Sequence, residues 1–250
     1  MTFPDGRTTP DGRPETLVFD SSAELIETAR ARFVDVITRA QESHGVASVA
    51  LTGGSNGIGL LKALAADSGD IAWDRVEIYW GDERFVRSTD PERNAGQAFD
   101  ALLSSVPVDP ARIHIIAPSD GEFGDDVEAA ARDYARLIGP ETVFDVHLLG
   151  MGGEGHVNSL FPHTAATAED SAPVVAVTDS PKPPPVRVTL TFPVINRSRE
   201  VWLLVSGEEK AQAVAEAHRG AARADWPCAG VDGAEATVWF LDRAAASQLD

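Results

Sequence analysis

The alternation of short β-rich runs with helical patterns most constrains how this chain folds. Apolar runs such as 46–52, 76–80 and 236–242 are separated by segments with helical periodicity. A chain that alternates in this way forms a mostly parallel sheet flanked by helices. We therefore expect an α/β fold in a single three-layer domain over residues 16–250, because no linker or change of composition divides it. Residues 1–15 have no apolar core, so they predict a flexible leader and not a signal peptide.

Capping patterns predict where helices begin and end. Ser21 and Glu24 have the spacing of a capping box, and Gly45 is a suitable stop for the helix that they open. Further helices are expected at 58–66, 95–104 and 125–138, and from Glu208 onward. Strands are expected at 16–20, 46–52, 76–80, 113–117, 144–150, 173–177, 187–191, 201–207 and 236–242, and the last of these is expected to close the sheet.

The charge balance excludes several classes of partner. Lysine and arginine number 21 against 39 aspartate and glutamate residues, which gives a net charge of −18. Such a chain is a poor nucleic-acid binder and is repelled by anionic membranes, and a small anionic ligand would need local cations. No apolar run approaches about 18 residues, so we expect no membrane span. The single cysteine, Cys228, excludes an internal disulfide and favours a cytoplasmic location.

The first polar cluster at a strand end is LTGGSNGIG, residues 51–59. Its position matters because open α/β sheets bind ligands beyond the carboxyl ends of their strands. Glycines allow a tight turn there, and the N–H groups that open the next helix suit a phosphate. Gly53, Gly54 and Ser55 are therefore a candidate anion site. A tight turn capped by Ser55 or Asn56 is the alternative.

The second cluster is WGDERFV, residues 80–86, which follows another expected strand. Asp82, Glu83 and Arg84 would lie at the same edge of the sheet as the glycine turn. Arg84 would offer a planar, permanently charged donor to an oxyanion. A solvated, charged turn is the alternative.

The third cluster, GMGGEGHVNSLFP at 150–162, places four glycines around one histidine. Glycines let the backbone approach a ligand closely, but a turn needs no histidine, so His156 is a candidate general base. A histidine packed under the loop is the alternative. His156 and His163 are seven residues apart, with no HExxH motif and no paired cysteines, so we expect no metal site.

Two further cations accompany these clusters: Arg187 after the proline-rich segment 181–186, and Lys210 in the first turn of a helix. The helix dipole disfavours a lysine there, and a bound anion would offset that cost. A solvated lysine is the alternative. The chain has no G-x-S-x-G elbow and Cys228 has no evident histidine partner, so covalent catalysis is not expected.

Five segments occur in an order typical of one family. They are TGGSNGIGLLKAL at 52–64, WGDERFV at 80–86 with Asn94 after it, FDVHLLGMGGEGHVNSLFP at 144–162, PKPPPVRVTLTFPVIN at 181–196 and LLVSGEEKAQAV at 203–214. Through them the chain resembles the glucosamine-6-phosphate isomerase/6-phosphogluconolactonase family from about residue 16 to residue 242. The resemblance implies a fold similar to that of the glucosamine-6-phosphate deaminases. It also implies hydrolysis of 6-phosphoglucono-δ-lactone to 6-phosphogluconate in the oxidative pentose phosphate pathway, with no metal or other cofactor.

The resemblance assigns roles to the candidate residues. The family's catalytic histidine falls on His156 and its active-site arginine on Arg84. Glu154 stands where the family usually has aspartate, and we include it in the catalytic set. Arg93 precedes Asn94 where the family often has serine, and is either a cation at the pocket rim or a surface charge. The expected substrate-binding set is Gly53, Gly54, Ser55, Asp82, Asn94, Arg187 and Lys210.

Two other functions stay open at this point. An isomerase or deaminase of amino-sugar phosphates on the same fold would need a base for a carbon-bound proton, and Asp82 could serve. A sugar-phosphate-binding protein without catalysis would keep the anion site and need no base. In each case the expected partner is a small sugar phosphate, and the expected assembly is a monomer or weak dimer.

Overall fold

A computed structural model describes residues 14–249. Its larger sheet contains β1 (Glu15–Phe19), β2 (Ala47–Leu51), β3 (Val76–Trp80), β5 (Val146–Leu149), β8 (Glu200–Val205) and β9 (Ala236–Asp242). These strands are all parallel and lie in the order β1-β9-β8-β5-β2-β3. The helices are α1 (Ser22–His44), α2 (Gly54–Ala66), α3 (Asn94–Ala98), α4 (Val127–Ile138), α5 (Ala165–Ala168), α6 (Phe192–Ile195) and α7 (Ala211–His218). The predicted α/β fold class is confirmed.

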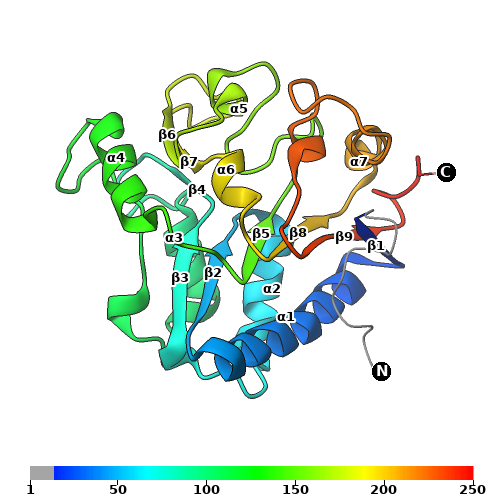
Figure 1. Ribbon diagram of the computed structural model, residues 1–250, viewed down its shortest axis with the longest axis horizontal. Coiled ribbons are helices and arrows are strands. Elements are labelled where there is room, and N and C mark those ends of the chain that lie inside the picture. The colour runs from blue at the N-terminus through cyan, green and yellow to red at the C-terminus, as the bar shows by residue number, and fades with distance from the viewer. Residues whose placement is uncertain (1–13, 250) are drawn as a thin grey trace.

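Side chains of the larger sheet alternate between two hydrophobic cores. In β8, Trp202 and Leu204 belong to the core that α1 and α2 complete, whereas Leu203 and Val205 belong to the core that α6 and α7 complete. Successive residues of a strand point to opposite faces, so a strand covered on both sides is apolar throughout. Figure 1 shows α1 and α2 on one side of the sheet and α6 and α7 on the other.

The predicted caps of the first long helix are present. Ser21 is the N-cap of α1, and its hydroxyl accepts a hydrogen bond from the backbone N–H of Glu24. Gly45 ends the helix with a φ of +90°, a conformation that glycine adopts without strain. These local signals fix where α1 begins and ends, and its buried residues, such as Phe33 against Trp202, hold it on the sheet.

A second, antiparallel sheet was not expected from the sequence. It consists of β4 (Asp82–Arg84), β7 (Arg187–Leu190) and β6 (Val174–Val177), in that order. Gly81 joins the two sheets, because its N–H donates to the carbonyl of Leu51 in β2 and its own carbonyl accepts from the N–H of Leu190. The segment 82–84, for which a solvated turn was one alternative, is a short strand whose backbone pairs with β7.

Several expected elements differ in the structure. The helix expected at 95–104 is α3 over Asn94–Ala98, followed by a π-helix over Phe99–Leu103. The strand expected at 113–117 is reduced to a single bridge between Ile113 and Ile78, because the chain leaves the edge strand β3 after the N–H of His114 has bonded to the carbonyl of Ile78. The helix expected from residue 58 already begins at Gly54. The strand expected to close the sheet, β9, instead lies between β1 and β8.

The N-terminal leader falls almost entirely outside the described residues. Of the predicted stretch 1–15, the structure describes Pro14 and Glu15, and Glu15 already belongs to β1. Within 14–249, none of the helices has both the length and the apolar character needed to cross a membrane.

Candidate active site

The candidate site lies where the order of the central strands reverses direction. From β2 the chain continues to β3 on one side, whereas β5 lies on the other side of β2 and is followed in the sheet by β8. Loops that leave neighbouring strands in opposite directions open a crevice at this point. The two loops meet there, since the N–H of Gly150 donates to Thr52 Oγ1 at 3.2 Å.

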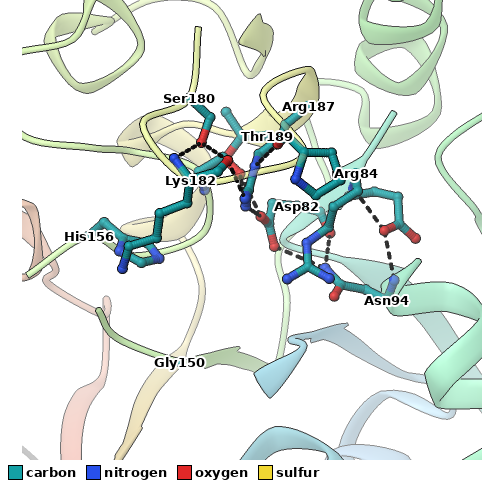
Figure 2. Close-up of polar contacts among 12 residues, drawn as sticks. Asp82, Arg84, Asn94, Gly150, His156, Ser180, Lys182, Arg187 and Thr189 are labelled. Atoms are coloured by element: carbon teal, nitrogen blue, oxygen red, sulfur yellow. Dashed lines mark hydrogen bonds and ion pairs between the residues drawn. The ribbon is translucent and has the colours of Figure 1, made fainter. Parts of the chain in front are cut away.

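A pocket of about 150 Å³ opens at this crevice. It is lined by the turn after β2, the strand β4, the start of α3, the glycine-rich loop after β5 and the start of β7. Figure 2 shows His156 and Lys182 on one side of this region and Arg84 and Asn94 on the other. The lining residues are Thr52, Gly53, Gly54, Asp82, Arg84, Asn94, Gly150, Met151, His156, Asn158 and Arg187.

The structure brings most of the predicted site residues to this pocket. Ser55, Glu154 and Lys210 are not among the lining residues. Ser55 is exposed on the first turn of α2, and Lys210 Nζ lies 3.6 Å from Glu209 Oε1. Glu154 stands behind His156 and contacts it directly.

The glycines of the loop after β5 make room for His156. The N–H of Gly152 donates to the carbonyl of His156 at 3.0 Å, which closes the loop on itself. A Cβ on Gly152 would lie 2.0 Å from Nδ1 of His156, so no other residue fits there. Gly155 has a φ of +78°, and a Cβ at that position would press on Cys228 and Trp226. The loop therefore needs glycine at both positions to present the imidazole.

Glu154 orients the imidazole of His156. Its Oε1 lies 3.0 Å from Nδ1, and the ring also stacks on Phe161 with centroids 4.4 Å apart. Hydrogen bonds from His156 and Lys182 hold the pKa of Glu154 well below its usual range, so this carboxylate is ionised and can only accept. Nδ1 must then carry the proton, which leaves the lone pair on Nε2. The arrangement is that of an oriented general base.

Lys182 is a member of the site that the sequence reading missed. Its Nζ lies 2.9 Å from Oε1 and 3.0 Å from Oε2 of Glu154. The sequence shows 181–186 as a proline-rich segment, and no local motif assigns its lysine a role. One signal in the sequence could have pointed to Lys182: lysine is rare in this chain, which contains three, Lys62, Lys182 and Lys210.

Asp82 ties together the centre of the pocket. Its Oδ2 accepts from Ser159 Oγ at 2.6 Å and its Oδ1 from Asn94 Nδ2 at 3.2 Å. Arg187 Nη1 lies 3.8 Å from Oδ2. Both carboxylate oxygens are therefore engaged by protein groups that hold the pocket walls in place.

Arg187 anchors the proline-rich loop as well as lining the pocket. Its guanidinium donates to the carbonyls of Lys182, Pro183 and Pro184 at 3.1, 3.3 and 3.0 Å. Burial lowers the pKa of Arg187, although a guanidinium stays charged at any physiological pH. Arg187, which was expected to bind the phosphate, thus uses most of its N–H donors on backbone carbonyls.

The strand β4 and helix α3 are fixed together by Glu83. Its carboxylate accepts from the backbone N–H groups of Asn94 and Ala95 at 2.7 and 2.8 Å, at the start of α3. Arg93 Nη2 lies 3.6 Å from Glu83 and also donates to the carbonyl of Ile116. Arg93 is 2% exposed and is absent from the pocket lining, so it is neither a rim cation nor a surface charge. It donates to the carbonyl of Arg84 at 3.4 Å and so supports the end of β4.

Three pocket residues keep unused hydrogen-bonding atoms. Arg84 Nε, Asn94 Oδ1 and Asn158 Oδ1 are buried without a partner among the described residues. Unpaired buried polar atoms are uncommon in folded proteins, and they concentrate where a polar ligand or water completes the site. The pocket therefore suits a polar molecule rich in hydroxyl or phosphate oxygens.

Residues 14–249 bring together no group of three or more histidine, cysteine, aspartate or glutamate side chains able to hold a metal ion. Burial raises the pKa of Cys228 to about 12, so its thiol is not a nucleophile at neutral pH.

The parallel sheet carries a pocket at its switch point, lined by cations and by one oriented imidazole. These features define an α/β protein suited to a small anionic ligand and to base catalysis. The sequence model described as glucosamine-6-phosphate isomerases/6-phosphogluconolactonase matches residues 20–239. The chain belongs to this family.

Individual relatives agree with this assignment. The chain is 51% identical to a 6-phosphogluconolactonase of Mycobacterium tuberculosis over 239 residues, covering 93% of this chain and 97% of the relative. It is also similar to the crystal structure of 6-phosphogluconolactonase from Thermotoga maritima, with a TM-score of 0.81 at 26% identity, covering 91% of this chain and 99% of that one. A monomeric glucosamine-6-phosphate deaminase shares the fold, with a TM-score of 0.79 at 23% identity, covering 94% of this chain and 99% of that one.

Proposed function

We propose that this protein hydrolyses 6-phosphoglucono-δ-lactone to 6-phosphogluconate, a step of the oxidative pentose phosphate pathway. The observation that carries the proposal is the pair of His156 and Glu154, 3.0 Å apart, beside a pocket lined by arginines. Lactone hydrolysis needs a base for water and a stabiliser for an oxyanion, and both groups are present. Relatives about half identical over nearly the whole chain bear the name 6-phosphogluconolactonase, which supports the same activity here.

In the proposed reaction, Nε2 of His156 takes a proton from water as the water oxygen bonds to the lactone carbonyl carbon. The carbonyl oxygen becomes an oxyanion, and Arg84 is the proposed donor that stabilises it. The carbon–oxygen bond to the ring oxygen then breaks, and the imidazolium returns the proton to that leaving oxygen. The new carboxylic acid releases its own proton to solvent. Glu154 stays ionised throughout and stabilises the imidazolium between the two steps.

The phosphate of the substrate is proposed to anchor the sugar away from the reacting carbon. The helix α2 begins at Gly54, and its first N–H groups together with Arg187 offer donors to an anion. Ser55 and Lys210 complete this proposed set, although neither lines the pocket without ligand. Remote binding of this kind orients the lactone for attack.

A coupled assay tests the proposal. The lactone is generated from glucose 6-phosphate at mildly acidic to neutral pH, and 6-phosphogluconate is detected with its own dehydrogenase. We expect wild-type acceleration over the blank and at least a hundredfold lower kcat for His156→Ala, since general-base catalysis typically contributes about 10²–10⁴-fold. Thermal melting with 6-phosphogluconate, which should stabilise both proteins, separates lost catalysis from lost binding.

The same experiments distinguish the alternatives. A sugar-phosphate-binding protein would be stabilised by 6-phosphogluconate without any turnover. An isomerase or deaminase would convert amino-sugar phosphates and leave the lactone at the blank rate. An isomerase or deaminase would need Asp82 as its base. Ser159 and Asn94 already donate to the two oxygens of Asp82, which argues against that function.

We further infer that the protein acts in the cytoplasm, without a cofactor, as one domain over residues 16–250 and as a monomer or weak dimer. The lone, buried Cys228 fits a reducing compartment. Sedimentation equilibrium at micromolar concentration would contradict the last inference if it gave a stable higher oligomer.

A further inference from the structure

We propose that Lys182 is a positioning residue for His156, which acts by offsetting the charge of the Glu154 carboxylate that holds the imidazole. This inference rests on the proposed function of His156 as a base, and it adds a third member to the His156–Glu154 pair. It assigns to the proline-rich loop a role in setting the pH range of the reaction.

The contact geometry carries the proposal. Glu154 Oε1 lies 3.0 Å from His156 Nδ1 and 2.9 Å from Lys182 Nζ, so one carboxylate oxygen serves both the imidazole and the ammonium. Oε2 lies 3.0 Å from the same Nζ. The Lys182 side chain is 45% exposed, and ion pairs at such positions contribute little to folding stability. Its position is better explained by its effect on Glu154 than by stability.

The loop that carries Lys182 is held from several directions. Ser180 Oγ donates to the carbonyl of Lys182 at 3.0 Å, and Arg187 Nη2 donates to the same carbonyl at 3.1 Å. Pro183 and Pro184 follow Lys182 directly, and their carbonyls accept further hydrogen bonds from Arg187. Figure 2 shows the Lys182 side chain running from this loop toward His156. The backbone is thus fixed so that a long, otherwise mobile side chain reaches Glu154.

The expected effect follows from electrostatics. A lone carboxylate next to a histidine favours the imidazolium, which is inactive as a base. The ammonium of Lys182 lies against the same carboxylate and offsets that field at the imidazole. The other charged groups of this region contact groups other than the imidazole. Asp82 and Arg84 on β4 and Arg187 on β7 line the pocket. Glu209, beside the glycine-rich loop, pairs with Lys210, and neither residue lines the pocket.

The chain offers matched variants for the test. Lys182→Met removes the charge while keeping an unbranched apolar stem, and Lys182→Arg keeps the charge. Lys62→Met removes one positive charge from an exposed position of α2, so it controls for the change in net charge. Because Lys182 is half exposed, all three proteins are expected to fold, which circular dichroism checks.

Two measurements decide the proposal. Proton NMR follows the titration of the His156 Hε1 resonance, assigned by its loss in His156→Gln, and the coupled assay gives kcat as a function of pH. For Lys182→Met we expect the His156 midpoint and the acidic limb of kcat to move to higher pH by about 0.5–1 unit, with KM changed less than about twofold. Lys182→Arg and Lys62→Met should keep the wild-type midpoint.

An unmoved midpoint in Lys182→Met, or an equal shift in Lys62→Met, overturns the proposal. A uniform fall in kcat at every pH also overturns it, since that is the mark of a purely structural role. If the NMR midpoint moves as expected but wild-type protein shows no turnover, the inference about Lys182 stands and the proposed function fails. The two failures are therefore separable.

Discussion

Replacing Glu154 by glutamine tests most directly how the site prepares its base. The substitution keeps the length of the side chain and removes the charge that faces Nδ1 of His156 at 3.0 Å. A glutamine oxygen can still accept the Nδ1 proton, but it does not stabilise the imidazolium that forms when water is deprotonated. The loss should therefore appear in the transition state, where the imidazole becomes positive.

The size of the effect follows from the contact. Hydrogen bonds to charged groups are worth about 1.5–3 kcal/mol, and the 35% exposure of the Glu154 side chain places this one at the lower end. At about 1.4 kcal/mol per factor of ten, about 1.5–2 kcal/mol corresponds to a fall in kcat of about 10–30-fold. KM should change little, because Glu154 does not line the pocket.

The coupled lactone assay measures this change, and Glu154→Asp is the matched control. Aspartate keeps the charge and loses one methylene, so it should retain at least about a third of wild-type kcat, a change of less than about 1 kcal/mol. A folded Glu154→Gln enzyme with kcat within twofold of wild type would refute the reasoning. Equal losses in the two variants would refute it as well, since length and not charge would then matter.

Other predictions address the frame of the site. Burial holds the pKa of His147 at about 3, below its unfolded value near 6.5. The free energy of unfolding of the wild type should therefore fall as pH drops from about 6.5 to about 3. In His147→Gln, thermal melts should show a weaker dependence of stability on pH. Gly53→Ala would place Cβ 2.2 Å from Asn94 Oδ1 and should lower kcat/KM at least tenfold. Gly96→Ala is the control: its Cβ meets nothing within 4 Å, so it should keep activity and raise stability by about 0.5–1 kcal/mol. Cys228, buried and with its pKa raised to about 12, should react with a thiol reagent at neutral pH only after unfolding.

The parts of the fold that the sequence predicted correctly depend on local patterns. The run 76–80 and the run 236–242 are strands over the predicted residues, and the Ser21 cap and Gly45 stop bound α1 as expected. The gathering of site residues was predictable for a related reason. Parallel strands share one carboxyl edge, so residues that follow strands meet in space whatever their separation in sequence.

The parts that were missed depend on distant partners. The strand β4 exists because Gly81 redirects the chain to pair with β7, more than a hundred residues later. Lys182 reaches Glu154 only because Arg187 and Ser180 hold its backbone. The run 113–117 has strand composition but passes an edge of the sheet with one bridge to Ile78. No local pattern encodes such contacts.

The pairing of arginines explains how an acidic chain presents positive charge at one pocket. Several other arginines pair closely with carboxylates, as Arg32 does with Glu15 at 2.7 Å and Arg223 with Asp170 at 2.6 Å. Such pairs cancel most of the field that a ligand would feel.

Arg84 and Arg187 are held differently. Arg187 donates to three backbone carbonyls and lies 3.8 Å from its nearest carboxylate partner, Asp82, and Arg84 donates to the carbonyl of Glu92, whose carboxylate is 3.9 Å away. Carbonyl dipoles fix a guanidinium without neutralising it, so most of its charge remains for an anionic ligand. The hydrogen-bond partners of Arg84 and Arg187, and not the net charge of −18, therefore decide which ligands this pocket attracts.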